Sequence, residues 1–163
     1  MMHSRTRLFT GLVLAAATSF GALRLTAQAT TGPRVEISFS QAARAEAVTG
    51  MVYLAISKDN QSPPIQQTDP EGVPLFSTFV ENLQPGTAAV ITSVNRGHPV
   101  ASLSDIPAGE YWVQPFVNVY TRFPRADGHT VWLHMDQWEG QNWKRSPGNL
   151  YGDPVRMRID PAS

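Results

Sequence analysis

The chain has 163 residues, with 13 basic (Lys and Arg) and 13 acidic (Asp and Glu) side chains and no cysteine. The lack of cysteine excludes disulfide frameworks and thiol catalysis, so hydrophobic packing has to hold the fold together. No basic run is long enough to serve as a phosphate-binding footprint, so we predict no nucleic-acid partner. The length suits one domain that buries a core without covalent cross-links.

The N-terminal residues have the pattern of a signal peptide. Two arginines precede an apolar stretch over residues 8–23, and Ala27-Gln28-Ala29 after it matches an A-x-A cleavage site. The apolar stretch is short for a membrane span, and a retained anchor is the alternative. We therefore predict a signal peptide over residues 1–29 and a mature domain over residues 30–163 without a membrane span. Export to the periplasm or the extracellular space follows from this pattern.

The mature chain has the pattern of strands and turns throughout. Seven apolar or alternating segments bounded by turn signals are typical of strands; they cover residues 34–40, 48–57, 76–83, 88–94, 111–120, 131–138 and 154–160. Segments rich in polar residues, Pro and Gly over residues 58–73, 121–130 and 139–153 indicate loops. Short strands without intervening helices predict an all-β fold, a single immunoglobulin-like or transthyretin-like β-sandwich of about seven strands.

The two strongest predicted strands have two different faces, because successive side chains of a strand point to opposite sides. One side is mainly aliphatic and suits a core: Tyr111, Val113, Pro115, Val117 and Val119, then Val131, Leu133 and Met135. The other side mixes aromatic and polar groups: Trp112, Gln114, Phe116, Asn118, Tyr120, Trp132, His134, Asp136 and Trp138. Rigid amphipathic aromatics are common interface anchors, so we predict a docking face. The alternative is that residues 139–153 fold back and cover it.

His129, His134, Asp136 and Glu139 are the candidate metal ligands, since imidazole and carboxylate bind zinc and similar ions. Their spacing argues against a metal site. His129 and His134 point to opposite faces of a continuous strand, and only His134 and Asp136 share a face. We predict no metal, no cofactor, and a structural His134 held by a neighbouring carboxylate or carbonyl group.

No catalytic set is recognisable in the sequence. The chain lacks the G-x-S-x-G motif of a nucleophile elbow and lacks a glycine-rich phosphate loop. Two alternatives stay open: a Ser–His–Asp set assembled from distant loops around His98, His129 or His134, and a carboxylate pair such as Asp136 with Glu139. The sequence therefore favours a protein that is not an enzyme.

Four segments of the second half carry a family resemblance: 106–111 (IPAGEY), 117–120 (VNVY), 134–141 (HMDQWEGQ) and 146–150 (SPGNL). They resemble the N-terminal region of secreted bacterial esterase-type proteins, in which a β-sandwich-like region precedes an α/β-hydrolase domain of the esterase D type. No catalytic residue of that hydrolase domain has a counterpart in this sequence. The resemblance implies an association with a hydrolase, either as a stand-alone copy of this region or as a piece of a longer esterase.

These observations together predict a non-catalytic, exported interaction module. Its expected partner is a hydrolase domain or another extracytoplasmic protein, bound by burial of aromatic area and by hydrogen bonds from Gln114, Asn118 and Asp136. Two alternatives come from other functional classes. One is a glycan-binding module whose exposed tryptophans stack on sugars, and the other is a small hydrolase.

Overall fold

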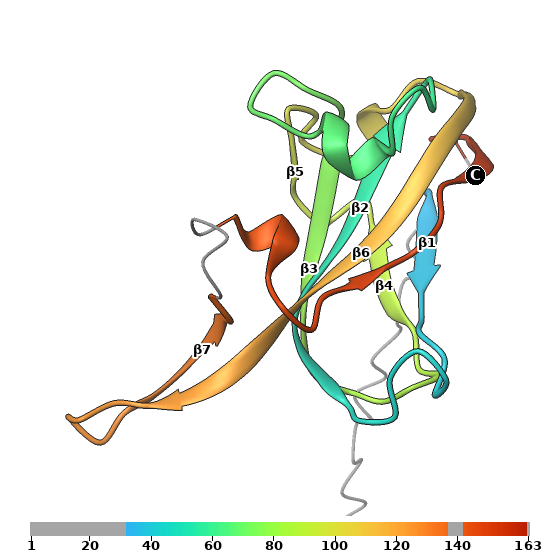
Figure 1. Ribbon diagram of the computed structural model, residues 1–163. Coiled ribbons are helices and arrows are strands. Elements are labelled where there is room, and N and C mark those ends of the chain that lie inside the picture. Colours follow the sequence, from blue (N-terminus) through green and yellow to red (C-terminus); the bar gives the residue numbers. More distant parts are fainter. Residues whose placement is uncertain (1–31, 137–141, 163) are drawn as a thin grey trace, which may run out of the picture.

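The computed structural model describes residues 32–136 and 142–162. The predicted signal peptide, residues 1–29, and the predicted site residue Trp138 lie outside the described residues. Within these ranges the protein is all-β, as predicted, and its helical structure is limited to short 3₁₀ turns (Figure 1). None of the helices in these ranges is long and apolar enough to cross a membrane.

Nine strands and three 3₁₀ turns follow one another along the described chain. The strands are β1 (Arg34–Ile37), β2 (Val48–Ser57), β3 (Leu75–Leu83), β4 (Ala89–Thr92), β5 (Gly97–His98), β6 (Gly109–Pro124), β7 (Thr130–His134), β8 (Leu150–Tyr151) and β9 (Val155–Ile159). The turns are η1 (Pro64–Gln67), η2 (Leu103–Asp105) and η3 (Trp143–Arg145). Each predicted strand overlaps an observed one, and the two that were missed, β5 and β8, have two residues each.

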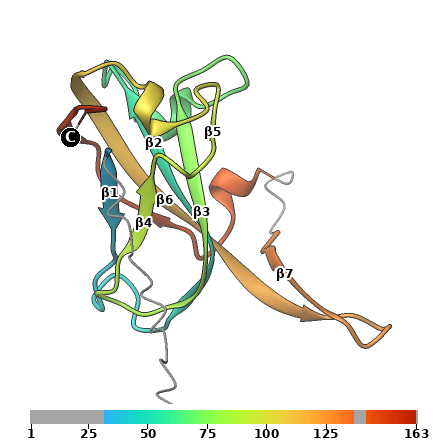
Figure 2. The same cartoon turned by 180° about the vertical axis from the view of Figure 1, so that it is seen from behind.

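Seven of the strands form one antiparallel sheet. Five of them follow one another in the order β5-β3-β2-β6-β7, and the short strands β8 and β9 also pair with β6. One edge of the long strand β6 pairs with β2. The other edge pairs with β9, then β8, then β7 along its length. β1 and β4 pair with each other in a separate two-stranded sheet, which lies across one face of the larger sheet (Figures 1 and 2). The strands therefore make two packed layers.

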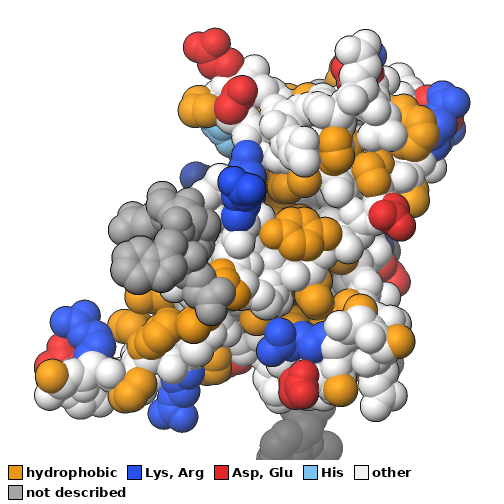
Figure 3. Space-filling model, viewed as in Figure 1, with side chains coloured by type: hydrophobic (Ala, Val, Ile, Leu, Met, Phe, Trp, Pro, Cys, Tyr) orange, Lys and Arg blue, Asp and Glu red, His pale blue; other side chains and the backbone are white. Residues whose placement is uncertain are grey.

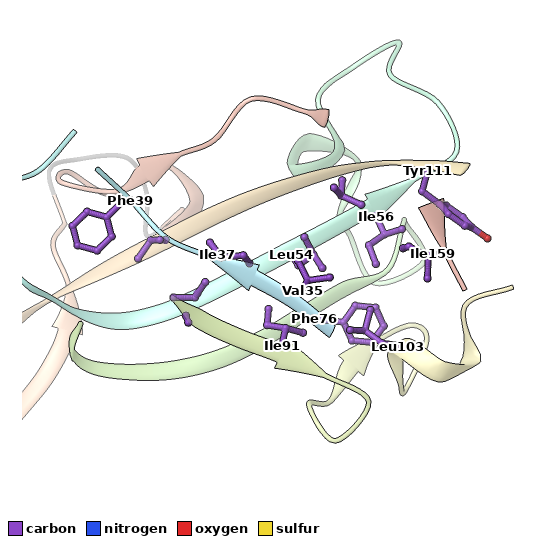
Figure 4. Packing of buried hydrophobic residues seen from close by; sticks show 14 of the residues in the cluster. Val35, Ile37, Phe39, Leu54, Ile56, Phe76, Ile91, Leu103, Tyr111 and Ile159 are labelled. Carbon is purple, nitrogen blue, oxygen red and sulfur yellow. The ribbon is translucent and has the colours of Figure 1, made fainter. Parts of the chain in front are cut away.

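The main core fills the space between the two layers (Figure 4). Its buried side chains come from both sheets and from the η2 segment: Val35, Ile37, Phe39, Val48, Val52, Leu54, Ile56, Phe76, Ala89, Ile91, Leu103, Ile106, Tyr111, Val113, Val117, Val119 and Ile159. The core face predicted for residues 111–120 is confirmed for Tyr111, Val113, Val117 and Val119, while Pro115 is half-buried. The alternation along β6 thus sets which side chains reach the core.

The β6–β7 hairpin is longer than predicted. The assignment of residues 121–130 to a loop is wrong, because β6 continues to Pro124 and β7 starts at Thr130. The Asp127-Gly128 pair makes the tight turn, with Gly128 at a φ of 84°. The strands continue past the body of the domain, so the hairpin projects from it (Figures 1 and 2).

The predicted core position of Val131, Leu133 and Met135 is also wrong. Leu133 is 53% exposed, and the other two side chains are only half-buried. β7 pairs with residues 120–124 of β6, the part of that strand that runs beyond the main core. The aliphatic face of β7 therefore has no second layer to pack against within the described residues.

Candidate functional site

The face of the large sheet that points away from the main core carries the central residues of the predicted docking set. Cross-strand pairing places Phe116 of β6, Tyr53 of β2 and Ser77 of β3 in one row across this face. Gln114 and Asn118 lie in the neighbouring rows on either side of Phe116. We call this side of β3, β2 and β6 the aromatic face.

The chain itself covers the middle of the aromatic face. The ring of Trp143, in η3, lies over Tyr53 and Phe116, with ring centroids 4.7 and 5.6 Å away. The ring of Tyr151, in β8, is 5.1 Å from that of Phe116, and Ile65 of η1 packs into the same cluster. Phe116 is consequently only 1% exposed. The outer face of the sheet thus has a small core of its own.

Gln114 fastens the covering segments to the sheet. Its Oε1 accepts a hydrogen bond from the backbone N–H of Ile65 at 3.0 Å, and its Nε2 donates to the carbonyl of Gly152 at 2.9 Å. One buried amide therefore satisfies a donor of the η1 segment and an acceptor of the segment after β8. The polar residue that the sequence assigned to partner binding makes these bonds within its own chain.

Gln114, Phe116 and Asn118 all lie inside the molecule rather than on a surface open to a partner. For the middle of the face the alternative prediction holds, in which the chain folds back over its own strands. Residues 142–153 supply the aromatic rings that cover it. The sequence reasoning missed the contribution of η1. The only signal for it was the apolar pair Pro64-Ile65 inside an otherwise polar loop.

The two ends of the predicted docking face lie far apart. Trp112 is half-buried near the start of β6, with the guanidinium of Arg156 5.9 Å from its ring centroid. Trp132 pairs with Arg122, ten residues further along β6. At the rise of an extended strand this is a separation of roughly 30 Å. Trp112 and Trp132 therefore belong to different surfaces.

The remaining described residues of the predicted face lie on or beside the hairpin. Tyr120 pairs with His134 across β6 and β7, and both side chains are half-buried. Trp132 and Asp136 are exposed. Figure 3 shows hydrophobic side chains gathered along this hairpin, at the lower left of the view. The exposed part of the predicted face is thus concentrated on β7.

His134 joins the hairpin to the segment after η3. Its Nδ1 lies 3.0 Å from Oγ of Ser146 and 3.3 Å from the carbonyl of Met135. Since a carbonyl oxygen only accepts, the contact favours a protonated Nδ1, which cannot take a proton from Ser146. Ser146 is also 2% exposed, so a substrate does not reach its hydroxyl. The sequence predicted a carboxylate or carbonyl partner for His134; the Met135 carbonyl is such a partner, whereas the Ser146 hydroxyl is one that the sequence did not predict.

The candidate metal ligands are spread over the hairpin. His129 lies in the exposed turn, with its Nδ1 3.3 Å from Oδ1 of Asp127, whereas His134 lies at the opposite end of β7. Within residues 32–136 and 142–162, no group of three or more His, Asp or Glu side chains could hold a metal ion. Glu139 lies outside these ranges.

Two pockets flank η3 on the aromatic face. The larger, of about 550 Å³, lies between η3 and β5 and includes Tyr53, Arg96 and Trp143 in its lining. The second, of about 500 Å³, is bordered by Gln114 and by residues of η1 and η3. Lys144 contributes to both pockets. The covering segment thus buries the centre of the face and leaves a hollow on each side.

Burial of the phenol of Tyr53, with a smaller effect from Tyr120, raises the pKa of Tyr53 from 10 to about 12. The unfolded phenol loses its proton near pH 10, so between about pH 10 and pH 12 deprotonation favours the unfolded state. We expect the free energy of unfolding to fall as the pH rises through this window. Tyr53→Phe should remove part of that fall, as measured by urea unfolding at several pH values. An unchanged pH slope for Tyr53→Phe would show that the phenol titrates as it does in water.

Comparison of the chain with models of protein families, with curated proteins and with solved structures gave no match. The function is therefore inferred from the sequence and from the geometry of the described residues.

Proposed function

We propose that this protein is an exported, non-catalytic interaction module that docks onto a partner domain through its β6–β7 hairpin. The resemblance of residues 106–151 to the region that precedes an esterase D type domain supports a hydrolase as the partner. Export to the periplasm or the extracellular space is supported by the signal-peptide pattern of residues 1–29. The immunoglobulin-like or transthyretin-like type of the sandwich belongs to the same proposal and is supported by the strand spacing.

A single observation carries the proposal: β7 is an edge strand with large apolar side chains open to solvent. It ends the sheet order, and Leu133 and Trp132 are 53% and 39% exposed. Proteins usually protect such edges with charged side chains, proline or a covering segment. β7 itself, Thr-Val-Trp-Leu-His, contains neither lysine nor proline. A strand of this kind fits a partner that adds its own strand to the sheet.

The hairpin also gives such a partner an anchor on each side. Trp132 and Leu133 are adjacent in β7, so their side chains point to opposite faces of the sheet. An added strand would contact the indole on one face and the leucine on the other. Its backbone would pair with the edge of β7 that has no partner strand in the part of the chain that the structure describes. The proposed interface therefore keeps Trp132 from the predicted docking face and adds Leu133, which the sequence assigned to the core.

Trp132→Ala and Leu133→Ala are each expected to weaken binding to an esterase D type α/β-hydrolase domain by about 2 kcal/mol, or about 30-fold in Kd. Both side chains are exposed, so the free energy of unfolding should change by only about 0.5 kcal/mol. Isothermal titration calorimetry of the purified protein against the hydrolase domain measures the affinity, and urea unfolding measures the stability.

Trp112→Ala is the matched control. It also removes a tryptophan side chain, but near the start of β6, far from the end of β6 that pairs with Trp132. Its affinity for the hydrolase domain should equal that of the unchanged protein. Equal losses of affinity for Trp112→Ala and Trp132→Ala, or a loss of stability without a loss of affinity for Trp132→Ala, would contradict docking through the hairpin.

Light scattering of the protein alone adds a further test. A dimer that dissociates on Trp132→Ala would make a second copy of this chain, and not a hydrolase, the occupant of the edge.

A further inference from the structure

The larger pocket beside η3, of about 550 Å³, includes no residue of the β6–β7 hairpin in its lining and has an apolar wall. The rings of Tyr53 and Trp143 form this wall, with centroids 4.7 Å apart and an angle of 34° between their planes. Leu75 extends it. Ser77 is the cross-strand neighbour of Tyr53, and its small side chain leaves space that a larger residue would fill. The pocket therefore offers ring surface along one side.

The rim of the pocket is cationic. The guanidinium of Arg96 is exposed and makes no hydrogen bond or ion pair with any residue in the two described ranges. Lys144 donates from Nζ to the carbonyl of Thr68, and its ammonium lies 5.8 Å from the centroid of the Trp143 ring. Burial lowers the pKa of Lys144, and the nearby carboxylate of Asp69 opposes that shift. The lining of the pocket thus contains two cations, Arg96 and Lys144, and one carboxylate, that of Asp69.

His98 and Ser77 complete the polar side of the pocket. Nε2 of His98 lies 2.7 Å from the carbonyl oxygen of Pro70. Because a carbonyl only accepts, Nε2 carries the proton and Nδ1 of the neutral ring is an acceptor. The hydroxyl of Ser77 can both donate and accept. These groups suit a ligand that carries hydroxyls as well as a charge.

We propose that this pocket binds a small ring-shaped carboxylate, and that a uronate unit of an acidic glycan is the ligand of this class that fits it best. The parts of the Tyr53 and Trp143 rings that line the pocket would lie against the ligand ring. Arg96 would pair with the carboxylate through its fork of N–H groups. His98 and Ser77 would bind the hydroxyls. The volume lies in the range of small-ligand sites.

An aromatic acid shares the ring and the charge but lacks the hydroxyls, so the experiment includes both sources. Isothermal titration calorimetry of the protein with digalacturonate is expected to give a Kd of about 1 mM, as suits a ligand of this size. Cellobiose, which is neutral, should bind at least about tenfold more weakly. Benzoate should bind more weakly than digalacturonate because it cannot use the hydroxyl-binding groups.

Arg96→Gln should weaken the binding of digalacturonate by at least about tenfold. Arg125→Gln is the matched control, because it removes an exposed arginine from the hairpin turn, and it should change nothing. Ser77→Leu places a larger side chain in the pocket and should abolish the binding of digalacturonate. Circular dichroism checks that each variant is folded.

Two results would support the site and three would overturn it. Digalacturonate binding that depends on Arg96 supports the uronate, and tighter benzoate binding with the same dependence supports a ring-carboxylate site for aromatic acids. Equal affinities for cellobiose and digalacturonate, or affinities that Arg96→Gln leaves unchanged, overturn the proposal. The absence of binding by either acid up to about 20 mM also overturns it, since this lies well above the expected Kd.

Discussion

Replacing Phe116 with alanine is expected to lower the free energy of unfolding by about 3–5 kcal/mol. The ring is 1% exposed and packs against Tyr53, Trp143 and Tyr151. Its removal would leave a cavity bounded on one side by the paired strands β2 and β6, which cannot move inward to fill it. Small domains are stable by only about 5–15 kcal/mol in total, so this is a large fraction. Urea unfolding followed by far-UV circular dichroism measures it.

Phe79→Ala is the matched control for this variant. Phe79 lies on β3, on the same face of the sheet as Tyr53, but beyond the cover formed by η1 and η3, and it is 54% exposed. Its truncation should cost about 1 kcal/mol or less. If Phe116→Ala costs no more than Phe79→Ala, the cover is not packed onto the sheet. The aromatic face would then be open to a partner, as the sequence first suggested.

The faces of β6 show how far the sequence alone could go. Alternation assigned Tyr111, Val113, Val117 and Val119 to one side, and all four lie in the main core. It also placed Phe116 on the other side, correctly. Alternation cannot say what lies over that second side, because a covering loop and a partner protein leave the same pattern in the strand. The cover depends on tertiary contacts of η1 and η3, segments whose polar composition indicated surface loops.

The hairpin shows a second limit. The turn signals Pro124 and Asp127-Gly128 predict a ten-residue loop over residues 121–130 that separates the two strands. Proline is tolerated at the end of a strand, and β6 includes it. The pairing therefore runs on to Pro124 opposite Thr130, and Trp132 lies opposite Arg122 instead of near Phe116. Because the paired strands extend a few residues further than predicted, Trp112 and Trp132 lie on two separate surfaces and not on one docking face.

The pocket proposed for a ring-shaped carboxylate was beyond reach of the sequence for a different reason. Its cations, Arg96 and Lys144, are 48 positions apart in the chain. Arg96 lies just before β5 and Lys144 lies in η3, and no local sequence pattern brings these two segments together. Trp143 falls within residues 139–153, which the sequence indicated only as a loop. Its contact with Tyr53 depends on how η3 folds back over β2, which is a long-range result of packing.

Replacing Gly50 with alanine is expected to cost about 3 kcal/mol or more of unfolding free energy. Gly50 pairs with Val119 of β6, at a register shift of β2, and has a φ of 156°. A Cβ atom there would lie 2.1 Å from the carbonyl oxygen of Asn118. Because that oxygen belongs to the backbone of the neighbouring central strand, the clash can be relieved only by separating β2 from β6.

Gly86→Ala separates this clash from the cost of the backbone conformation. Gly86 also has a positive φ, of 80°, but a Cβ atom there would meet no atom within 4 Å. Its substitution should cost about 1–2 kcal/mol, the usual penalty for a side chain in the left-handed region. Urea unfolding of both variants gives the difference, which we expect to be at least about 1 kcal/mol. Equal losses would mean that φ alone makes Gly50 necessary. A larger loss at Gly50 would mean that the close approach of the β6 backbone requires glycine at this position. The consequence extends beyond one residue, since β2 and β6 contribute side chains both to the main core and to the aromatic face.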